Sequence, residues 1–497
     1  MKYISTRGGG LAVGSAGAIK SGIAPDGGLY APESRVEIGP GLLERLRPAD
    51  YRKRAAMILS HYLTDFSDSE IEECARGAYG PAFDTPDIAP VRELDETTYV
   101  QELWHGPTSA FKDMALQILP RFLPLAAKKT GESAEIVILV ATSGDTGKAA
   151  LEGFRDVPGT RIMVFFPDQG VSEVQRLQMV TQEGGNVGVA AVMGNFDDAQ
   201  SGVKAIFTDR GMIEELGKKG FKFSSANSIN WGRLAPQIVY YFSAYADLLN
   251  RGRITAGEPV NFVVPTGNFG NILAGYYARE AGLPVNRLVC ASNENNVLTD
   301  FIRTGVYDRK RKFYRTLSPS MDILISSNLE RLLYHLSGGS AAGVRGWMEE
   351  LGEKGRYEVG GNTLKQIHDL FWADFADDRE TLMTIRETYL RYRYLVDTHT
   401  AVAIDVCGKY RAATGDKTPA VILSTASPYK FNGSVVRALL GDEAVAGRSE
   451  FELLEILSRE SGTEIPKNLR GLDKKPVLHG TVVNREDMAA AVRDFLA

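Results

Sequence analysis

Between residues 135 and 292 the chain alternates short, almost wholly apolar runs with longer amphipathic ones, and this alternation constrains the fold more than any other feature. The amphipathic runs fit helices, whereas the apolar runs are too short for helices and fit buried strands. Strands that alternate with helices indicate a parallel sheet covered on both faces. The predicted strands are EIVILVAT (135–142), RIMVFFP (161–167), NVGVAAVMG (186–194), FKFSSAN (221–227), VNFVVP (260–265) and NRLVCASN (286–293), with PAVILSTASP (419–428) further on.

The flanking regions read differently. Residues 40–80 have a helical pattern, residues 305–400 are mostly helical and charged, and a helical stretch begins at Lys430. We therefore predict an α/β protein with two parallel-sheet domains and an N-terminal extension.

The composition limits the classes of molecule that the protein is expected to bind. The chain has 497 residues, and 57 basic against 62 acidic side chains give a formal charge of −5 without long runs of one sign. Nucleic acid and anionic membranes are therefore poor candidate partners. No signal-peptide pattern and no run of ~20 apolar residues is present, which favours a cytoplasmic protein. Cys74, Cys290 and Cys407 are far apart and lack metal-ligand spacing, so we expect neither disulfides nor a metal site.

A lysine in an apolar turn is the first candidate for chemistry. In HGPTSAFKDMALQILPRFLPL (105–125), a Gly-Pro turn leads into a predicted amphipathic helix with Lys112 in its opening turn. Most helix lysines are solvated. Here Ala110, Phe111 and Met114 flank Lys112, and an apolar setting lowers an amine pKa and favours imine formation.

Two glycine-containing turns, each between a predicted strand and a helix, are candidate anion sites. The first comprises Gly267, Asn268, Phe269, Gly270 and Asn271, whose backbone N–H groups can close on a phosphate. It lacks the G-x-G-x-x-G spacing of a dinucleotide site. A plain tight turn is the alternative.

The second turn is ATSGDTGKAALEG (141–153). It is not a P-loop, because Thr142 stands where glycine is needed and Ala149 where serine or threonine is needed. Its hydroxyls, on Thr142, Ser143 and Thr146, suit a carboxylate or a phosphate ester. A simple N-cap from Ser143 or Asp145 is the alternative.

Taken together, these strings resemble the threonine synthase family, which belongs to the tryptophan synthase β-like, fold type II enzymes that use pyridoxal 5'-phosphate (PLP). The resemblance spans most of the chain, and its strings occur in one order. They are YISTRGGG, GIAPDGGLYAPE, HGPTSAFKD, ATSGDTG, VSEVQRLQM, GNFDDAQ, SSANSINWGRLAPQIVYYF, PTGNFGNILAGYYA, DTHTAVA and STASPYKF. HGPTSAFKD and SANSINWGR are more specific than the glycine turns, which many fold type II enzymes share.

The resemblance implies roles residue by residue. Lys112 matches the lysine that carries PLP as a Schiff base, residues 267–271 match the loop that holds the cofactor phosphate, and Thr425 matches the partner of the pyridine nitrogen. Asp145 would lie near the ring hydroxyl of the cofactor. Substrate would meet Thr142, Ser143, Thr146, Asn227 and Arg233.

The resemblance also implies a division of the chain. The N-terminal domain would take residues 1–90, the large PLP-binding domain residues 91–132 and 230–497, and a small mobile domain residues 133–229.

Two positions depart from the family pattern. Lys148 stands where a small residue is common, and Ser427 stands where many members have histidine. We expect Lys148 to be a solvated lysine on the outer helix face, with contact to a substrate phosphate as the alternative. Arg176 and Lys204 are further anion candidates that the sequence does not rank against Arg233.

The implied activity is conversion of O-phospho-L-homoserine and water to L-threonine and phosphate, the last step of threonine biosynthesis, by a monomer or homodimer. Two alternatives stay open. One is a threonine or serine ammonia-lyase, which uses the same fold. The other is a threonine-synthase-like protein that binds phospho-ligands without catalysis, although neither loss of the lysine nor erosion of the glycine loop is seen.

Overall fold

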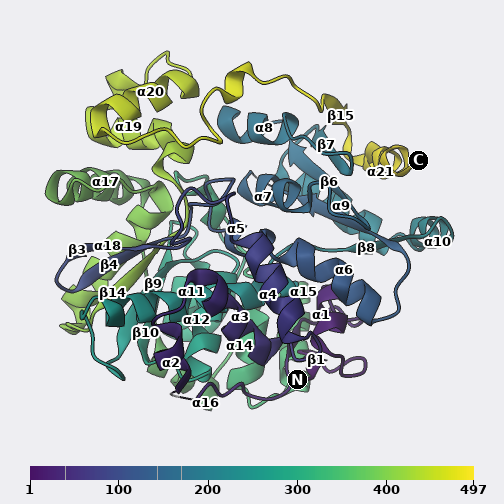
Figure 1. The fold of residues 1–497 in the computed structure, drawn as a ribbon, viewed down its shortest axis with the longest axis horizontal. Coiled ribbons are helices and arrows are strands. Elements are labelled where there is room, and N and C mark those ends of the chain that lie inside the picture. The colour runs from purple at the N-terminus through teal and green to yellow at the C-terminus, as the bar shows by residue number, and fades with distance from the viewer. Residues whose placement is uncertain (40, 143, 170) are drawn as a thin grey trace.

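Two separate, largely parallel sheets dominate the computed structural model, which describes residues 1–39, 41–142, 144–169 and 171–497 (Figure 1). The larger has the order β13–β10–β9–β14–β4–β3 and the smaller the order β15–β7–β6–β5–β8. Among the described strands of these two sheets, only β3 pairs antiparallel, with β4, which confirms the predicted α/β class. The large sheet comprises β3 (Val91–Asp95), β4 (Thr98–Glu102), β9 (Val260–Pro265), β10 (Val285–Ser292), β13 (Phe371–Phe375) and β14 (Ala420–Ser424).

The large sheet is covered on both faces, which explains why its strands are uniformly apolar. In β9, Phe262 and Val264 belong to one apolar cluster and Val263 to another, because successive side chains point to opposite faces. The first cluster includes α11 (Trp231–Asn250) and α12 (Gly270–Glu280), and the second includes α18 (Thr398–Thr414). Both faces therefore exclude water.

The small sheet contains β5 (Glu135–Ala141), β6 (Thr160–Pro167), β7 (Val187–Val192), β8 (Phe221–Ser224) and β15 (Thr481–Val483). Its helices are α7 (Asp145–Phe154), α8 (Glu173–Val180), α9 (Phe196–Thr208) and α10 (Arg210–Lys218).

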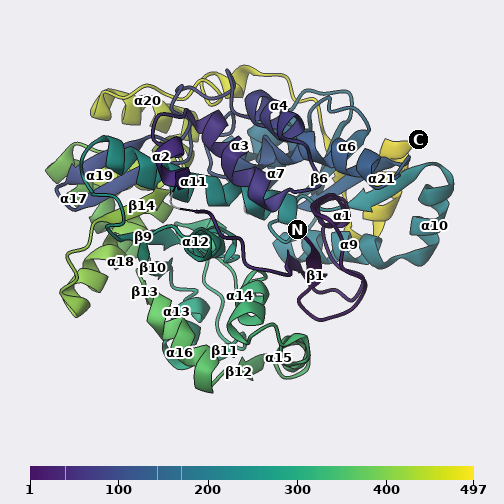
Figure 2. The same ribbon diagram turned by 60° about the horizontal axis from the view of Figure 1, so that its bottom comes forward.

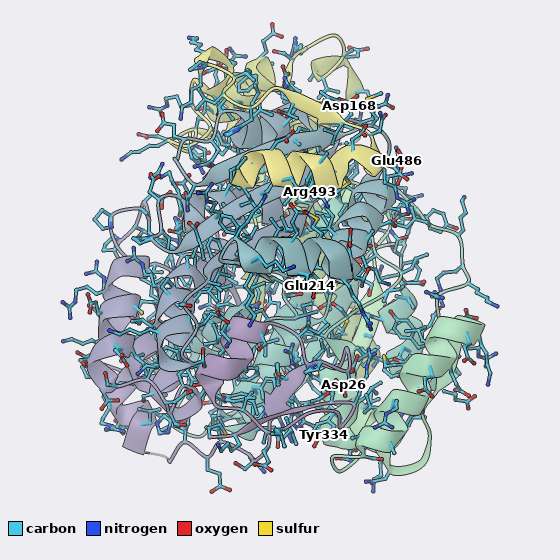
Figure 3. The ribbon with its side chains drawn as sticks, turned by 90° about the vertical axis from the view of Figure 1, so that its right-hand side faces the viewer. Asp26, Asp168, Glu214, Tyr334, Glu486 and Arg493 are labelled. Carbon is cyan, nitrogen blue, oxygen red and sulfur yellow. The ribbon has the colours of Figure 1, made fainter. Side chains whose placement is uncertain are left out.

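One expected boundary is wrong. The predicted division places the C-terminal residues in the large domain, but β15 pairs in parallel with β7 of the small sheet. The final helix, α21 (Met488–Leu496), packs its Met488 and Val492 into the core of that same sheet, and Arg493 forms an ion pair with Glu215 at 3.0 Å. Figure 3, in which Arg493 is labelled, shows this helix lying across the small-sheet region. The small unit is thus completed by a segment almost 300 residues away in sequence.

The N-terminal part forms a layer of its own, and the helical prediction for residues 40–80 is confirmed by the helices described between residues 41 and 78. A two-stranded sheet pairs β1 (Tyr3–Ser5) with β2 (Tyr30–Pro32). Helices α1 (Ser15–Ser21), α2 (Gly41–Leu46), α3 (Tyr51–Tyr62) and α4 (Asp68–Ala78) complete the layer. Arg7 joins it to the rest of the protein through an ion pair with Glu330 at 2.8 Å.

The remaining elements connect or cover these units. Figure 2 shows α13, α15 and α16 with β11 and β12 as a protrusion below the large sheet. Among the described residues, no helix combines the length and hydropathy that crossing a bilayer requires. The bounds are α5 (Asp113–Leu116), α6 (Leu119–Lys129), α13 (Val297–Thr304), β11 (Val306–Asp308), η1 (Pro319–Met321), α14 (Leu329–Leu336), α15 (Ala341–Lys354), β12 (Arg356–Glu358), α16 (Gly361–Leu370), α17 (Asp378–Tyr392), η2 (Pro428–Phe431), α19 (Asn432–Leu440), η3 (Asp442–Ala444), α20 (Glu450–Ser461), η4 (Leu472–Lys474) and η5 (Arg485–Asp487).

Candidate active site

The candidate segments all follow the carboxyl ends of parallel strands. Lys112 comes after β4, the glycine loop after β9, Thr425 after β14 and Asp145 after β5. Strands β4, β14 and β9 are neighbours in the large sheet, so three of these segments meet at one edge. Such an edge is where ligands of α/β sheets usually bind.

Lys112 is buried at the start of a very short helix. It is the N-cap of the four-residue α5, not part of one long amphipathic helix, and α6 begins separately at Leu119. Only 8% of Lys112 is exposed, and its Nζ lies 5.0 Å from the centroid of the Phe111 ring. The expected apolar setting is confirmed.

The amine of Lys112 also faces polar groups. Its Nζ donates to Ser320 Oγ at 3.3 Å and lies 3.7 Å from Asp145 Oδ2. Burial lowers the pKa of Lys112 to about 8, against the attraction of Asp145 and with further lowering by the charges of Arg233 and Lys430. About a tenth of the amine is therefore neutral and nucleophilic at pH 7, and about half near pH 8.

Backbone contacts fix the turn that carries Lys112. Thr108 donates to the Asp113 carboxylate from its backbone N–H and its hydroxyl, both at 2.8 Å. Burial raises the pKa of Asp113 to about 7 despite these two hydrogen bonds. The backbone N–H of Phe111 donates to the carbonyl of Thr425 at 2.8 Å, which places the 6%-exposed Thr425 directly beside the lysine turn.

The glycine loop has the features of an anion cradle. Phe269 adopts φ 62° and caps α12, an 11-residue helix whose N-terminus faces the loop. Asn271 accepts hydrogen bonds from Tyr240 and Tyr241 through Oδ1, but its buried Nδ2 has no partner in the described structure. An orphaned buried donor at a helix N-terminus fits an anionic ligand such as a cofactor phosphate.

The glycine loop and Lys112 both contact one residue, Ser320. A side chain at Gly267 would meet the backbone carbonyl oxygen of Ser320 at 2.9 Å, so only glycine fits there. The hydroxyl of Ser320 is the group that accepts from Lys112. Asn268 is exposed, and its carbonyl accepts from the backbone and side chain of Asn328 at 3.1 and 3.0 Å. The cradle and the amine therefore lie on either side of Ser320.

The turn before α7 places Asp145 in the site, but fewer of its hydroxyl groups are free to bind a ligand than we expected. Thr142 is buried and its hydroxyl accepts from the backbone N–H groups of Gly144 and Gly147 at 3.0 and 2.9 Å, so it holds the turn itself. Thr146 is half-buried, and Ser143 lies outside the described residues. Gly144 is the N-cap of α7 and Asp145 is the first helical residue, so the capping alternative does not hold for Asp145.

Asp145 is almost completely enclosed, with 2% of its side chain exposed. Burial alone would raise its pKa, but Lys430 and then Lys112 hold the pKa well below its usual range. Gln175 of α8 also donates to Asp145 Oδ1 at 3.0 Å.

Of the anion candidates, Arg233 is the best placed. It is 6% exposed, and its guanidinium donates to the carbonyl of Ala226 at 2.7 Å. Burial lowers the pKa of Arg233 to about 10, and no described carboxylate forms an ion pair with it. Asn227, which follows Ala226 in the segment before α11, is half-buried. Arg176 is half-buried, and Lys204 is exposed.

The prediction for Lys148 is wrong. Its side chain is only 12% exposed, and its Nζ donates to Glu152 Oε2 at 3.0 Å and to Gln182 Oε1. Lys148 therefore belongs to a buried ion pair one turn along α7, because Gln182 packs against the helix face that was expected to be solvated.

Sequence reasoning missed several residues at the site. Ser320, Gln175 and Lys430 contact Lys112 or Asp145, and the backbone N–H of Ser320 donates to His399 Nε2 at 3.1 Å. Lys430 and His399 lie inside strings that carried the family resemblance, STASPYKF and DTHTAVA, which was the available signal.

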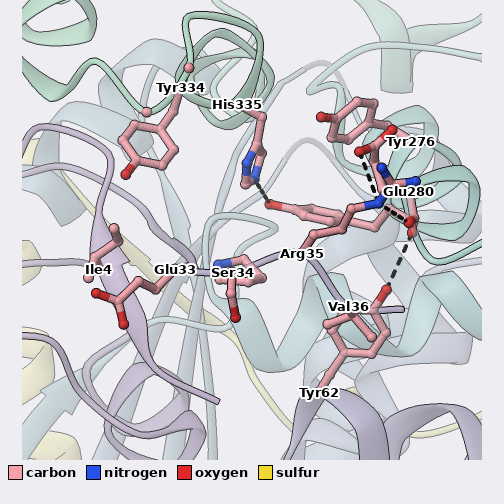
Figure 4. Close-up of a pocket in the computed structure, with 14 residues that line it drawn as sticks. Ile4, Glu33, Ser34, Arg35, Val36, Tyr62, Tyr276, Glu280, Tyr334 and His335 are labelled. Carbon is pink, nitrogen blue, oxygen red and sulfur yellow. Dashed lines mark hydrogen bonds and ion pairs between the residues drawn. The ribbon is translucent and has the colours of Figure 1, made fainter. Parts of the chain in front are cut away.

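A separate cavity of about 400 Å³ lies in another part of the protein, between the N-terminal layer and the C-terminal ends of α12 and α14 (Figure 4). Tyr277 and His335 form a 2.9 Å hydrogen bond in its wall, and burial lowers the pKa of His335 to about 4. None of its lining residues belongs to the Lys112 site.

Comparisons with known families agree along the whole chain. Residues 2–79 match the family "Threonine synthase N terminus", residues 81–426 match "Pyridoxal-phosphate dependent enzyme", and residues 400–495 match "Threonine synthase, C-terminal".

Individual proteins give the same result. Threonine synthase of Pseudomonas aeruginosa is 38% identical over 97% of this chain and 99% of its own length. Human threonine synthase-like 1 is 40% identical over 85% of this chain, but the match spans only 57% of that longer protein.

Solved structures agree as well. A PLP-bound threonine synthase from Brucella melitensis has a TM-score of 0.88 and 36% identity, covering 100% of this chain and 99% of that one. Yeast threonine synthase also has a TM-score of 0.88, with 32% identity, covering 100% of this chain and 98% of the other. With its sheets, its buried lysine and these matches together, the chain belongs to the threonine synthase family of pyridoxal-phosphate dependent enzymes.

Proposed function

We propose that the protein is a threonine synthase, a carbon–oxygen lyase that converts O-phospho-L-homoserine and water to L-threonine and phosphate. The single observation that carries this proposal is the buried amine of Lys112, whose pKa of about 8 leaves it reactive, next to the glycine cradle at the start of α12. The family membership supports this reaction over the ammonia-lyase and the non-catalytic alternatives.

The residues present fit PLP. Lys112 would bind it covalently as a Schiff base, residues 267–271 with the orphaned Nδ2 of Asn271 would hold its phosphate, and Thr425 would meet its pyridine nitrogen. Asp145 would lie near the ring hydroxyl. When bound, PLP supplies an electron sink that stabilises negative charge at the substrate carbons.

The chain's own residues would bind and orient the substrate. Arg233, a buried cation without a described carboxylate partner, is suited to the substrate phosphate. Asn227, which follows the Ala226 whose carbonyl accepts from Arg233, would also meet the substrate. Thr146 and the N-terminus of α7 would hold the substrate carboxylate. Thr142 would shape the turn rather than bind directly, because its hydroxyl accepts from the backbone of Gly144 and Gly147.

Lys112 would also move protons. With the cofactor and substrate bound, the Nζ of Lys112 would lie in the site as a general base for the Cα proton of the substrate. Ser320 Oγ, at 3.3 Å, keeps that amine in position. Closure of the small-sheet unit would exclude bulk water until the one reacting water is needed.

A direct assay tests the proposal. Purified protein loaded with PLP is mixed with O-phosphohomoserine, and threonine and phosphate are measured together, with 2-oxobutyrate formed from threonine as the parallel readout. We expect threonine and phosphate in equal amounts and Lys112→Ala to abolish both. Formation of 2-oxobutyrate as the main activity would favour the ammonia-lyase instead, and binding of PLP without turnover of either substrate would favour the non-catalytic alternative.

We also propose that the enzyme acts in the cytoplasm, as a monomer or homodimer. The near balance of 57 basic and 62 acidic residues, without long runs of one sign, makes anionic membranes and nucleic acid poor candidate partners.

A further inference from the structure

Lys430 is a buried charge that the proposed reaction does not use. Its side chain is 0% exposed, and its Nζ lies 2.6 Å from Asp145 Oδ1. The same Nζ donates to the carbonyl of Thr108 at 3.1 Å. A lysine is almost never fully buried unless its charge is paired, so this pair is a specific feature of the site.

The pair joins the two sheets. Lys430 lies in η2, which follows β14 of the large sheet, and Thr108 lies on the turn after β4 of that sheet. Asp145 opens α7, which follows β5 of the small sheet. On the small-sheet side, Gln175 of α8 donates to the same oxygen, Oδ1, at 3.0 Å. The Asp145 carboxylate is therefore held by Lys430 from the large-sheet side and by Gln175 from the small-sheet side of the seam, the boundary between the two sheets.

Asp145 forms a closer ion pair with Lys430 than with Lys112. Its Nζ is 3.7 Å from Asp145 Oδ2, whereas Lys430 is 2.6 Å from Oδ1. We propose that Lys430 is a positioning residue whose ammonium holds the Asp145 carboxylate across the seam between the two sheets and withholds part of its charge from Lys112.

The charges that face Lys112 set the direction of the effect. Asp145 of α7 raises the pKa of Lys112, whereas Arg233 of α11 and Lys430 of η2 lower it. Loss of Lys430 removes one repulsion and leaves Lys112 as the remaining ion-pair partner of Asp145. Both changes favour the protonated amine, so Lys112 becomes less reactive near neutral pH.

The test measures the titration of Lys112 itself. Full-length protein is freed of PLP, acetylated with acetic anhydride across a pH series, and the modification of Lys112 is read by mass spectrometry. In Lys430→Met we expect the pH midpoint to rise by about one unit, the usual size of a nearby-charge effect in a buried site. Lys430→Arg keeps the charge, so its Lys112 midpoint should lie close to that of the wild-type protein.

Two further variants separate this role from simple structural support. Asp145→Asn removes the attraction that raises the pKa of Lys112, so its midpoint should fall, a direction that general loosening of the site does not predict. Lys148→Met removes an ion-paired lysine within α7 whose side chain is 12% exposed. The Lys112 midpoint in this variant should equal that in the wild-type protein. If Lys430→Met does not fold, the Lys430→Arg and Asp145→Asn results decide the matter.

The inference rests on the proposed role of Lys112, and the two are tested separately. Each variant is first loaded with PLP, and absorbance of the lysine-bound cofactor shows whether Lys112 carries it. Absence of that absorbance in the unmodified protein contradicts the proposed function. Normal loading with an unshifted midpoint in Lys430→Met, or an equal shift in Lys148→Met, overturns the role of Lys430 alone.

Discussion

Arg233 keeps a guanidinium inside the protein with only a backbone carbonyl as its described partner, and a buried cation of this kind needs an anion. Arg233→Gln should raise the KM for O-phosphohomoserine about 10- to 100-fold, because a charged hydrogen bond is worth about 1.5–3 kcal/mol. PLP binding, followed by absorbance, should change little. Arg176→Gln serves as the matched control, and an equal effect there would mean that the wrong arginine was assigned.

His105 gives a pH-dependent contribution to stability. Burial lowers its pKa, but Asp84 at 2.5 Å and Glu102 at 3.0 Å outweigh burial and raise the pKa to about 9. A histidine whose pKa is raised on folding stabilises the protein fully below its unfolded pKa of about 6.5, and that stabilisation is lost as the pH rises through 9. The advantage in unfolding free energy over His105→Gln should therefore shrink between pH 6.5 and 9. A pH-independent difference in urea melts would contradict this.

Single residues also show where sequence reasoning stops. The burial of Lys112 follows from its apolar neighbours along the chain. The pairing of Lys430 with Asp145 does not, because the two are 285 positions apart and only the fold brings them together. The solvated position expected for Lys148 is wrong for the same reason, since Gln182 reaches it from a loop after a different helix.

At the level of elements, the turn into α7 depends on one glycine. Gly144 has φ 145°, and a Cβ there would lie 2.5 Å from the amide of Gln175, which donates to Asp145. Gly144→Ala should displace Gln175 and strain the backbone, weakening PLP binding by about tenfold or more. Titration with PLP measures this.

A second glycine provides the control. Gly217 lies in α10, and a methyl group added there would meet no other atom within 4 Å. Gly217→Ala should therefore leave PLP binding unchanged and stabilise the helix by up to about 1 kcal/mol. Equal loss of PLP binding in both variants would show that the strain at Gly144 is not the cause.

The strands formed by apolar runs were predictable in both sheets, whereas β15 was not. β5, β6, β7, β9 and β14 follow from continuous apolar runs, whereas β15 has three residues, none of them buried, and becomes a strand only by pairing with β7. The helix predicted across residues 105–125 is broken because Pro120 lies in the first turn of α6, where a missing N–H and a fixed φ favour a new start.

At the scale of the whole molecule, the C-terminal segment ties the two units together. It leaves α20, passes over α8, where Leu478 donates from its backbone to the carbonyl of Val180 at 2.8 Å, and ends in β15 and α21 (Figure 1). No local pattern predicts this crossing, because the partner strand lies almost 300 residues earlier.

This crossing predicts a local effect from a terminal mutation. Val492 is 0% exposed in the small-sheet core, so Val492→Ala should cost about 2 kcal/mol there. Amide hydrogen exchange should quicken in β6 and β7 and stay unchanged in β9 and β14. Uniform quickening in both sheets would mean that the two units unfold as one.

The proposed reaction is defined by the bond that breaks. Threonine synthesis by β,γ-replacement breaks the Cγ–O bond of O-phosphohomoserine, and the water oxygen becomes the hydroxyl of threonine. The reaction run in ¹⁸O-labelled water, with both products weighed by mass spectrometry, tests this most directly. We expect one ¹⁸O in threonine and none in the phosphate released, with no product from Lys112→Ala. Label in the phosphate, accompanied by homoserine, would contradict it.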